Sequence, residues 1–386
     1  MHWFYGILGA LLAAVWLDRL RDAAFGLRGV PKIAGPEWDR GPKLQPRATV
    51  IVAARNEQEH IEAALGSLLV LDYPDYEVLA VNDRSTDRTG EILDRLAREN
   101  PARLRVLHVS ELPPGWLGKP HAIGLAAQQA TGDWLLFTDA DVSFRPDALR
   151  RALLCAEEIH ADHLVLFPTA LMHSLGERMV FAFFPTLAVF GHRPWKVSDP
   201  RTRDYLGMGA FNLIRRQVYE DLGVRQALRM DVLDDMKMGK LVKQGGYAQR
   251  VAAGYGLISL RWGHGALGVL DNLTKNLFAL MLYRWPRTLG AAFLLLLINL
   301  GPFVGLVFAP GWTRLGYALA VGGVAFIYLC MSRYSRISPL YSMLHPVSTL
   351  LFAGTLLRSM VLILGRGGVV WRGTKYPLDE LRKGLV

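Results

Sequence analysis

The chain has 386 residues, of which 51% are hydrophobic, and a formal net charge of +10 at pH 7. This is more apolar than a soluble enzyme usually is, so membrane segments are the first feature to seek. The basic residues are scattered and no nucleic-acid-binding module accompanies them, which argues against a nucleic-acid partner and favours membrane lipids as their counter-charge. With only Cys155 and Cys330, the chain has neither a disulfide framework nor a cysteine zinc site.

The first predicted element is an apolar helix near the N-terminus. It lacks the basic start and the small-residue cleavage site of a secretory signal, so we interpret residues 1–20 as an uncleaved membrane anchor. Arg19 and Arg21 follow it, which predicts a cytoplasmic location for the next domain by the positive-inside rule. Residues 21–47 are rich in glycine and proline and are typical of a linker.

Residues 48–285 predict an α/β domain with a mostly parallel sheet. Three strands are predicted, a continuous apolar one at 48–54, one at 76–83 that ends in polar residues, and one at 104–110, and they alternate with segments of helical spacing. Such strands are buried on both faces, and ligands collect at their carboxyl ends. The chain places these polar residues there: Arg55, Asn56, Glu57, Asn82, Asp83, Asp139 and Asp141.

In LLFTDADVSF (135–144) an apolar run and a threonine are followed by two carboxylates one residue apart, Asp139 and Asp141. Both can reach one divalent cation, since hard cations such as Mg²⁺ and Mn²⁺ prefer oxygen ligands and often share a diphosphate. Taken alone the pattern is weak evidence, because most such pairs are solvated turn residues. The histidines, His163 among them, lack the spacing of a zinc site and are interpreted as structural.

Four motifs that occur in order along the chain favour a functional interpretation of Asp139 and Asp141. They are VIVAARNE (50–57), VNDRSTDRT (81–89), TDADV (138–142) and LDDMKMG (233–239). With them the sequence resembles the family 2 glycosyltransferases, inverting enzymes of GT-A fold that use nucleotide-activated sugars. The resemblance covers about Thr49 to Trp285 and implies a metal-dependent enzyme of the hexosyltransferase type.

The resemblance also implies roles for particular residues. Asp235 is the expected general base, with Asp234 as the alternative, and Asp141 with help from Asp139 is expected to hold Mg²⁺ or Mn²⁺. The competing interpretation of residues 234 and 235 is that they cap a helix. The nucleotide-sugar is expected to contact Ala53, Arg55, Glu57, Asp83, Lys119, Asp139 and Gly209.

Two positions depart from the family's pattern. Asn82 stands where an Asp-Asp pair usually begins, and the usual Gln-x-x-Arg-Trp lacks its glutamine. Arg261 and Trp262 are therefore expected to assist the leaving group, but Arg284-Trp285 is a rival pair.

Within the family the chain is similar to the membrane-bound members that glycosylate lipids, namely the hopene-associated, carotenoid-type and ceramide-glucosyltransferase-like enzymes. The motifs that carry this similarity are LPPGWLGKPHA (112–122), SDPRTRDYLGMGAFNLIRR (198–216), SLRW (259–262) and VVWRGTKY (369–376). It implies transfer from a nucleotide-sugar, by family preference a UDP-sugar, to a lipid acceptor. The alternatives are a polysaccharide synthase, a nucleotide-forming transferase and an inactive membrane scaffold.

Residues 286–364 predict a membrane region. The uncharged runs 289–309 and 315–331 are long enough to span, whereas 341–364 contains Arg358. If that last segment crossed the membrane, the basic tail 365–386 would lie outside the cell, against the positive-inside rule. An interfacial or re-entrant segment and a cytoplasmic tail are therefore expected.

The phenylalanine-rich stretch 176–195 is expected to form an interfacial helix, the alternative being a buried helix of the α/β domain. Together these features predict an integral protein of the bacterial inner membrane, with its catalytic domain facing the cytoplasm.

Overall fold

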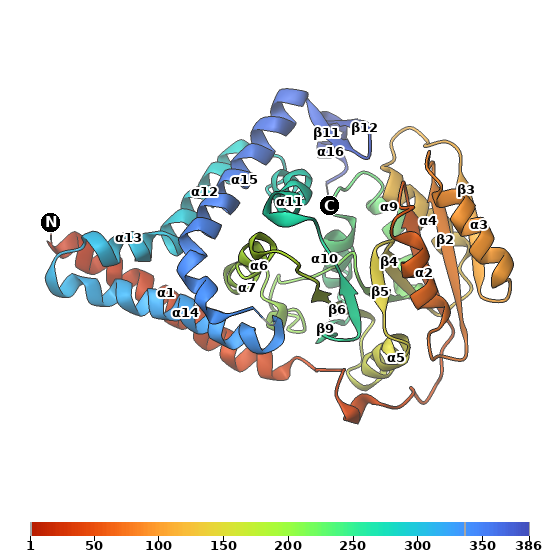
Figure 1. Ribbon diagram of the computed structural model, residues 1–386, viewed down its shortest axis with the longest axis horizontal. Coiled ribbons are helices and arrows are strands. Elements are labelled where there is room, and N and C mark those ends of the chain that lie inside the picture. Colours follow the sequence, from red (N-terminus) through yellow and green to blue (C-terminus); the bar gives the residue numbers. More distant parts are fainter. Residues whose placement is uncertain (1, 336, 386) are drawn as a thin grey trace. The chain divides into compact units, whose positions relative to one another are not determined.

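The computed structural model describes residues 2–335 and 337–385 (Figure 1). The chain divides into two compact units, which we call the helical unit and the sheet unit. The helical unit comprises Met1–Gly29, Met172–Arg193 and Trp262–Trp371. The sheet unit comprises Val30–Leu171, Pro194–Arg261 and Arg372–Val386.

Within the described residues, the sheet unit contains a seven-stranded sheet of order β3-β2-β1-β4-β8-β6-β9. Its strands are β1 (Ala48–Ala54), β2 (Tyr76–Asp83), β3 (Leu104–Val109), β4 (Trp134–Asp139), β6 (His163–Phe167), β8 (Asn212–Arg215) and β9 (Gln249–Ala253). Among these seven, β8 pairs antiparallel with both neighbours and the other pairs are parallel. The predicted mostly parallel α/β sheet is thus confirmed.

Helices cover both faces of this sheet. They are α2 (Ile61–Leu69), α3 (Thr89–Glu99), α4 (Gly118–Gln129), α5 (Ala148–Glu158), α8 (Arg216–Asp221), α9 (Val224–Ala227) and α10 (Asp234–Gln244). Successive residues of β1 enter opposite cores: Val50 packs in one with α2 and α5, and Ile51 packs in the other with α4 and α10. Because neither side faces water, the strand is apolar throughout.

Smaller elements complete the sheet unit. A three-stranded sheet has the order β5-β10-β7, and β12 and α16 lie near the C-terminus. Their bounds are β5 (Val142–Phe144), β7 (Thr169–Ala170), β10 (Ile258–Leu260), β12 (Thr374–Pro377) and α16 (Leu378–Lys383).

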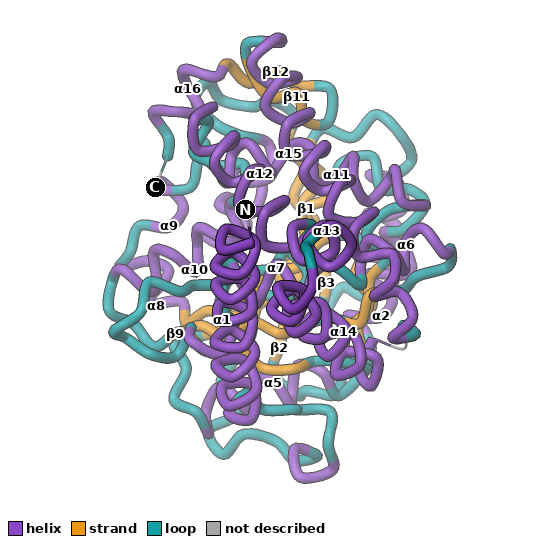
Figure 2. Tube along the Cα trace, turned by 90° about the vertical axis from the view of Figure 1, so that its left-hand side faces the viewer, coloured by secondary structure: helices purple, strands orange, loops and turns teal. Residues whose placement is uncertain are grey.

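The helical unit is built almost entirely of helix (Figure 2). Its elements are α1 (His2–Gly26), α6 (Leu175–Phe181), α7 (Phe184–Phe190), α11 (Gly265–Leu280), α12 (Trp285–Asn299), α13 (Gly301–Phe308), α14 (Arg314–Ser335), α15 (His345–Arg366) and the short strand β11 (Gly368–Trp371). In the part of the chain that the structure describes, three helical segments are long and apolar enough to cross a membrane: His2–Gly29, Gly311–Ser332 and Pro339–Arg366.

A fourth candidate span is broken. The continuous helix expected over residues 289–309 is wrong in one respect, since α12 and α13 meet at a bend of 46°. Pro302 has no N–H to donate to the carbonyl of Ile298. That carbonyl instead accepts the indole N–H of Trp16, at 2.9 Å. The bend therefore places a polar backbone group where another helix satisfies it.

The charge on α15 has a partner. Arg358 donates to the carboxylate of Asp271 on α11 at 2.5 Å, within the helical unit. Both side chains are exposed at the surface of the helical unit, but a paired charge still costs less at bilayer depth than a free one. Of the two arguments against a membrane crossing at residues 341–364, the charge of Arg358 is therefore weakened. The argument from the basic tail is unchanged.

The phenylalanine-rich stretch 176–195 supplies α6 and α7. Phe183 is fully buried, and its ring lies 4.8 Å from that of Phe352 on α15. Residues 176–193 of this stretch belong to the helical unit, and Phe183 lies in its hydrophobic core.

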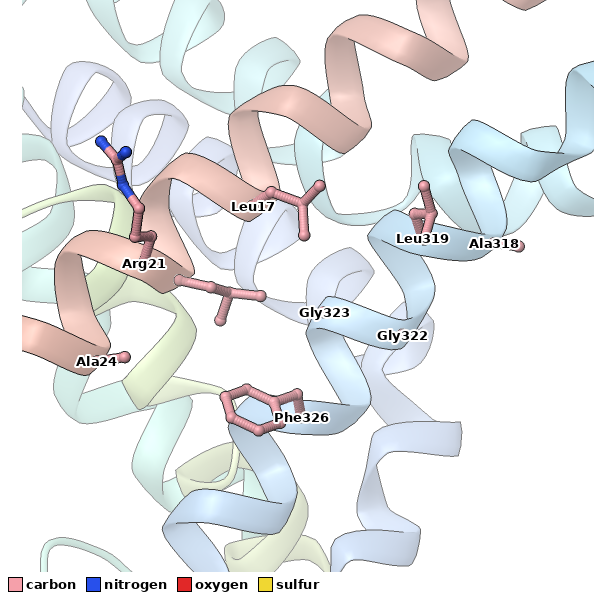
Figure 3. A pocket seen from close by; sticks show the side chains of 9 residues that line it. Leu17, Arg21, Ala24, Ala318, Leu319, Gly322, Gly323 and Phe326 are labelled. Carbon is pink, nitrogen blue, oxygen red and sulfur yellow. The ribbon is translucent and has the colours of Figure 1, made fainter.

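Helices α1 and α14 approach closely at glycines. A methyl group built on Gly316 would lie 2.4 Å from the carbonyl carbon of Gly9, and a backbone atom cannot rotate away. Farther along α14, Gly322 has open space and lines a groove of about 470 Å³ between the two helices, beside Leu17 and Phe326 (Figure 3). The same helix thus holds one glycine that the packing needs and one that it does not.

This contrast gives a matched pair of variants. Gly316→Ala is expected to lower the free energy of unfolding by about 1–3 kcal/mol, because the helices must separate. Gly322→Ala should be neutral or slightly stabilising, because alanine favours the helix. Unfolding of both variants in the same detergent measures their difference in stability. Equal unfolding midpoints would contradict the close contact between Gly316 and Gly9.

Candidate functional site

The carboxyl ends of three strands meet at one edge of the sheet. Ala53 of β1 lies opposite Val81 of β2 on one side and opposite Asp139 of β4 on the other. The loops after β1 and β2 are joined, since Asn56 accepts the Thr86 amide at 2.8 Å. The carboxyl ends of β1, β2 and β4 therefore lie together, as the order of strands predicted.

At this edge a lysine is surrounded by carboxylates. The Lys119 ammonium, at the start of α4, donates to Asp139 at 2.6 Å and lies 3.9 Å from Asp234. Lys119 and Asp234, together with Gly209 and Asp235, line a small cleft of about 10 Å³, and Asp139 adjoins it through its contacts with Lys119 and Gly209. The sequence named all five, and the structure brings them together.

Asp234 and Asp235 are the first two residues of α10. Leu233 holds the N-cap position and its side chain makes no cap hydrogen bond, whereas the Asp235 carboxylate accepts the Met236 amide of the first turn at 2.7 Å. Asp235 therefore stabilises the start of the helix, and this does not exclude a second, chemical role. Burial raises the pKa of Asp235, the Lys119 charge opposes this, and Asp139 adds to it. A buried carboxylate beside a cation can hold or release a proton.

The loop 206–209 fits tightly between the strands and α10. The carbonyl of Gly209 accepts the Asp139 amide at 2.9 Å, and a methyl group on Gly209 would lie 2.2 Å from the Asp139 carboxylate. At Gly207 a methyl group would collide with the backbone carbonyl of Asp235. Both glycines are therefore required by close approach, and the loop sets the distance between these two aspartates.

Asp141 follows β4 in the turn before β5. Burial raises its pKa to about 6, with further contributions from the negative charges of Asp139 and Glu57. Crowded carboxylates of this kind suit a hard divalent cation, which would relieve their repulsion. Among the described residues no group of three or more His, Cys, Asp or Glu could hold a metal alone, so a cation here would need ligands from substrate or water.

The end of β2 carries a buried ion pair. Asp83 is 4% exposed, and Arg84 donates to both of its oxygens, at 2.7 and 3.1 Å. A methyl group on Gly118, the residue before Lys119, would lie 2.6 Å from each partner. This pair therefore abuts the start of α4.

The residues predicted to assist the leaving group fall in both units. Arg261 ends a segment of the sheet unit, whereas Trp262 and the rival Arg284-Trp285 belong to the helical unit. The ring of Trp262 lies 5.6 Å from that of Phe184. The structure thus places Trp262 in an aromatic cluster of the helical unit.

Sequence reasoning missed the support behind the site loop. His163 on β6 is fully buried. Its Nε2 lies 3.1 Å from the side-chain oxygen Oδ1 of Asn212, and its Nδ1 lies 2.8 Å from the side-chain nitrogen Nε2 of Gln249. Gln249 also exchanges two hydrogen bonds with the backbone of Leu206, at the start of the loop. No local signal reveals this network, because its three side chains come from three separate strands.

Burial of His163 predicts acid sensitivity. Burial lowers the pKa of His163 to about 4 from its ordinary value near 6.5. Between these values the unfolded chain binds a proton that the folded chain does not, so stability falls as the pH drops from 6.5 to 4, by at most about 3 kcal/mol. Denaturant unfolding across this range should show the slope. If His163→Gln kept the same slope, its origin would lie elsewhere.

A fold of this kind, with acidic groups and a lysine at the carboxyl edge of the sheet, defines a GT-A-like transferase. Among solved structures, the chain is similar to the mannosyltransferase PcManGT from Pyrobaculum calidifontis in complex with GDP-Man and Mn²⁺. The TM-score is 0.52 at 19% identity, covering 93% of this chain and 99% of that one.

The sequence model of the family described as Glycosyl transferase family 2 matches residues 49–223. A curated relative, 4,4'-diaponeurosporenoate glycosyltransferase of Staphylococcus aureus (strain USA300), is 24% identical over 342 residues, which are 86% of this chain and 88% of the relative. The chain is a glycosyltransferase that carries a family 2 domain.

Proposed function

We propose that the protein transfers a sugar, with inversion, from a nucleotide-sugar to a lipid acceptor in the membrane. The observation that carries this proposal is the cleft lined by Asp234, Asp235 and Lys119 at the carboxyl edge of the sheet, beside which Asp139 pairs with Lys119. An inverting transfer needs one positioned base and no protein nucleophile, and this cleft offers a buried carboxylate for that role.

Asp235 is the proposed base. Its ionised form would accept the proton of the acceptor hydroxyl or carboxyl as the acceptor oxygen bonds to the anomeric carbon and the nucleoside diphosphate departs. Lys119 favours the ionised form and Asp139 opposes it. Asp234, 3.9 Å from Lys119, is the alternative base.

Asp139 and Asp141 are the proposed ligands of Mg²⁺ or Mn²⁺. A bound divalent cation would supply positive charge for the departing diphosphate. Lys119, now paired with Asp139, is flexible enough to turn its ammonium toward the same phosphates. Arg261 is proposed to add a second fixed positive charge near the diphosphate. Arg55, Glu57 and Asp83 are proposed to bind the nucleoside end of the donor. Uridine diphosphate is the first nucleotide to test for binding.

The lipid acceptor is inferred from the membrane region and from the relatives. The helical unit contains three candidate spans, and the curated relative is named for a diaponeurosporenoate acceptor. Arg19 and Arg21, which follow the apolar part of α1, favour a cytoplasmic location for the sheet unit. The cytoplasm is the compartment in which sugar nucleotides are made. The C-terminal tail is proposed to lie on the same side.

The test uses the purified full chain in detergent with Mn²⁺ or Mg²⁺. It is incubated with a panel of radiolabelled sugar nucleotides and total membrane lipid, and label is followed into the organic phase. Cation-dependent label in lipid supports the proposal and identifies the donor. Label confined to water-soluble polymer would instead support a polysaccharide synthase, and nucleotide binding without any transfer would favour an inactive scaffold.

A further inference from the structure

A short C-terminal segment, Arg372–Tyr376, lies against the carboxyl edge of the sheet inside the sheet unit. At its first residue, the Arg372 guanidinium donates to the backbone carbonyl of Arg55 at 2.9 Å and pairs with the carboxylate of Glu57. Arg55 in turn reaches the Thr374 hydroxyl at 3.5 Å. The segment is therefore fastened to the loop that follows β1.

The last residue of the segment, Tyr376, contacts the end of β2 and the start of α4. The Gly118 amide, at the start of α4, donates to the Tyr376 hydroxyl at 3.2 Å. Arg84, which donates to both oxygens of Asp83, also interacts electrostatically with that hydroxyl. One tyrosine oxygen thus connects the end of β2 with the start of the helix that carries Lys119.

The burial of this contact argues against incidental surface packing. Tyr376 is 5% exposed and Asp83 is 4% exposed, although both end in polar groups. Buried polar groups are costly unless their hydrogen bonds are satisfied, so the arrangement of Arg84 depends on the hydroxyl that Tyr376 supplies.

We propose that Tyr376 is a positioning residue of the nucleotide site, whose hydroxyl fixes the Asp83–Arg84 pair and the Gly118 amide where the nucleoside end of the donor binds. This inference rests on the proposed function, which assigns Asp83 to the nucleoside. Tyr376 lies ten residues after α15, so the donor site requires a residue that follows the last candidate span. A chain shortened before Tyr376 would then bind nucleotide weakly even with every carboxylate of the cleft present.

The test compares Tyr376→Phe with the wild-type full chain in detergent. Affinities for uridine diphosphate and guanosine diphosphate are measured by calorimetry with Mn²⁺, and the affinity for Mn²⁺ alone by electron paramagnetic resonance. Removing the hydroxyl is expected to weaken the binding of the preferred nucleotide about 5- to 10-fold. The Mn²⁺ affinity should not change, because the groups that the Tyr376 hydroxyl contacts are not the proposed cation ligands Asp139 and Asp141; a merely structural role would weaken the binding of Mn²⁺ as well as that of the nucleotide.

The matched control is Tyr247→Phe. Its hydroxyl also hydrogen-bonds within the sheet unit, to Asp221 at 2.9 Å, but it belongs to neither the cleft nor the C-terminal segment. Equal nucleotide affinities in Tyr376→Phe and wild type would overturn the inference, and tighter binding would too, because the segment would then be a competitor of the nucleotide. If the wild type binds neither nucleotide, the proposed function and this inference fail together.

Discussion

Asp235→Asn is expected to slow sugar transfer about 1,000-fold while leaving nucleotide affinity nearly unchanged. An amide cannot accept the acceptor's proton, and general base catalysis contributes roughly 10²–10⁴-fold in enzymes. Because asparagine has the volume of aspartate, the contacts of Gly207 with this residue's backbone persist. Initial rates and calorimetric nucleotide binding, measured on the same preparation, separate the two effects.

The matched control for the base is Asp75→Asn. Asp75 immediately precedes β2 at the opposite end of the strand, where it pairs with Arg47 at the surface. It should transfer sugar at the wild-type rate. Should Asp235→Asn also do so, the base is a different residue, and Asp234→Asn becomes the decisive variant.

The rate should also depend on pH in a definite direction. Burial raises the pKa of Asp235, so its carboxylate takes up a proton at a higher pH than an exposed aspartate does. Transfer should therefore decline as the pH falls through this raised pKa. A rate that rises on acidification would contradict the assignment of Asp235 as base.

Asp141→Asn is expected to lower cation-dependent nucleotide binding about 100-fold, and chelation of the cation should have a similar effect on the wild type. The variant loses one of two proposed carboxylate ligands. Since the pKa of Asp141 is about 6, protons should compete with Mn²⁺ below that pH, and the wild-type affinity for Mn²⁺ should fall there.

Thermal unfolding without a cation distinguishes this loss from misfolding. The raised pKa means that ionised Asp141 destabilises the fold above about pH 6, and this cost disappears as the pH falls toward 3.8. Asp141→Asn should thus be at least as stable as the wild type at neutral pH. A surface control, Asp94→Asn on α3, should change neither property, and an unstable Asp141→Asn would argue for a structural carboxylate.

The amino-acid sequence by itself determined the layers of the fold and the edge at which the site lies. The run ATVIVAA became β1 with the predicted bounds, because a strand buried on both faces is apolar except where a side chain such as Thr49 is hydrogen-bonded. Polar residues after such strands must leave the core, which is why Asp139 and Asp83 could be placed at one edge in advance.

Only the tertiary structure decided which groups touch. The contact between Lys119 and Asp139, the support of the site loop by His163, and the contact of Tyr376 with Gly118 join residues that are 20 to 258 positions apart or lie on different strands. Periodicity and turn chemistry act over a few neighbouring residues, whereas these contacts depend on how the whole chain packs. The carboxylates of the site could be predicted from local patterns, but the residues that hold them in place could not.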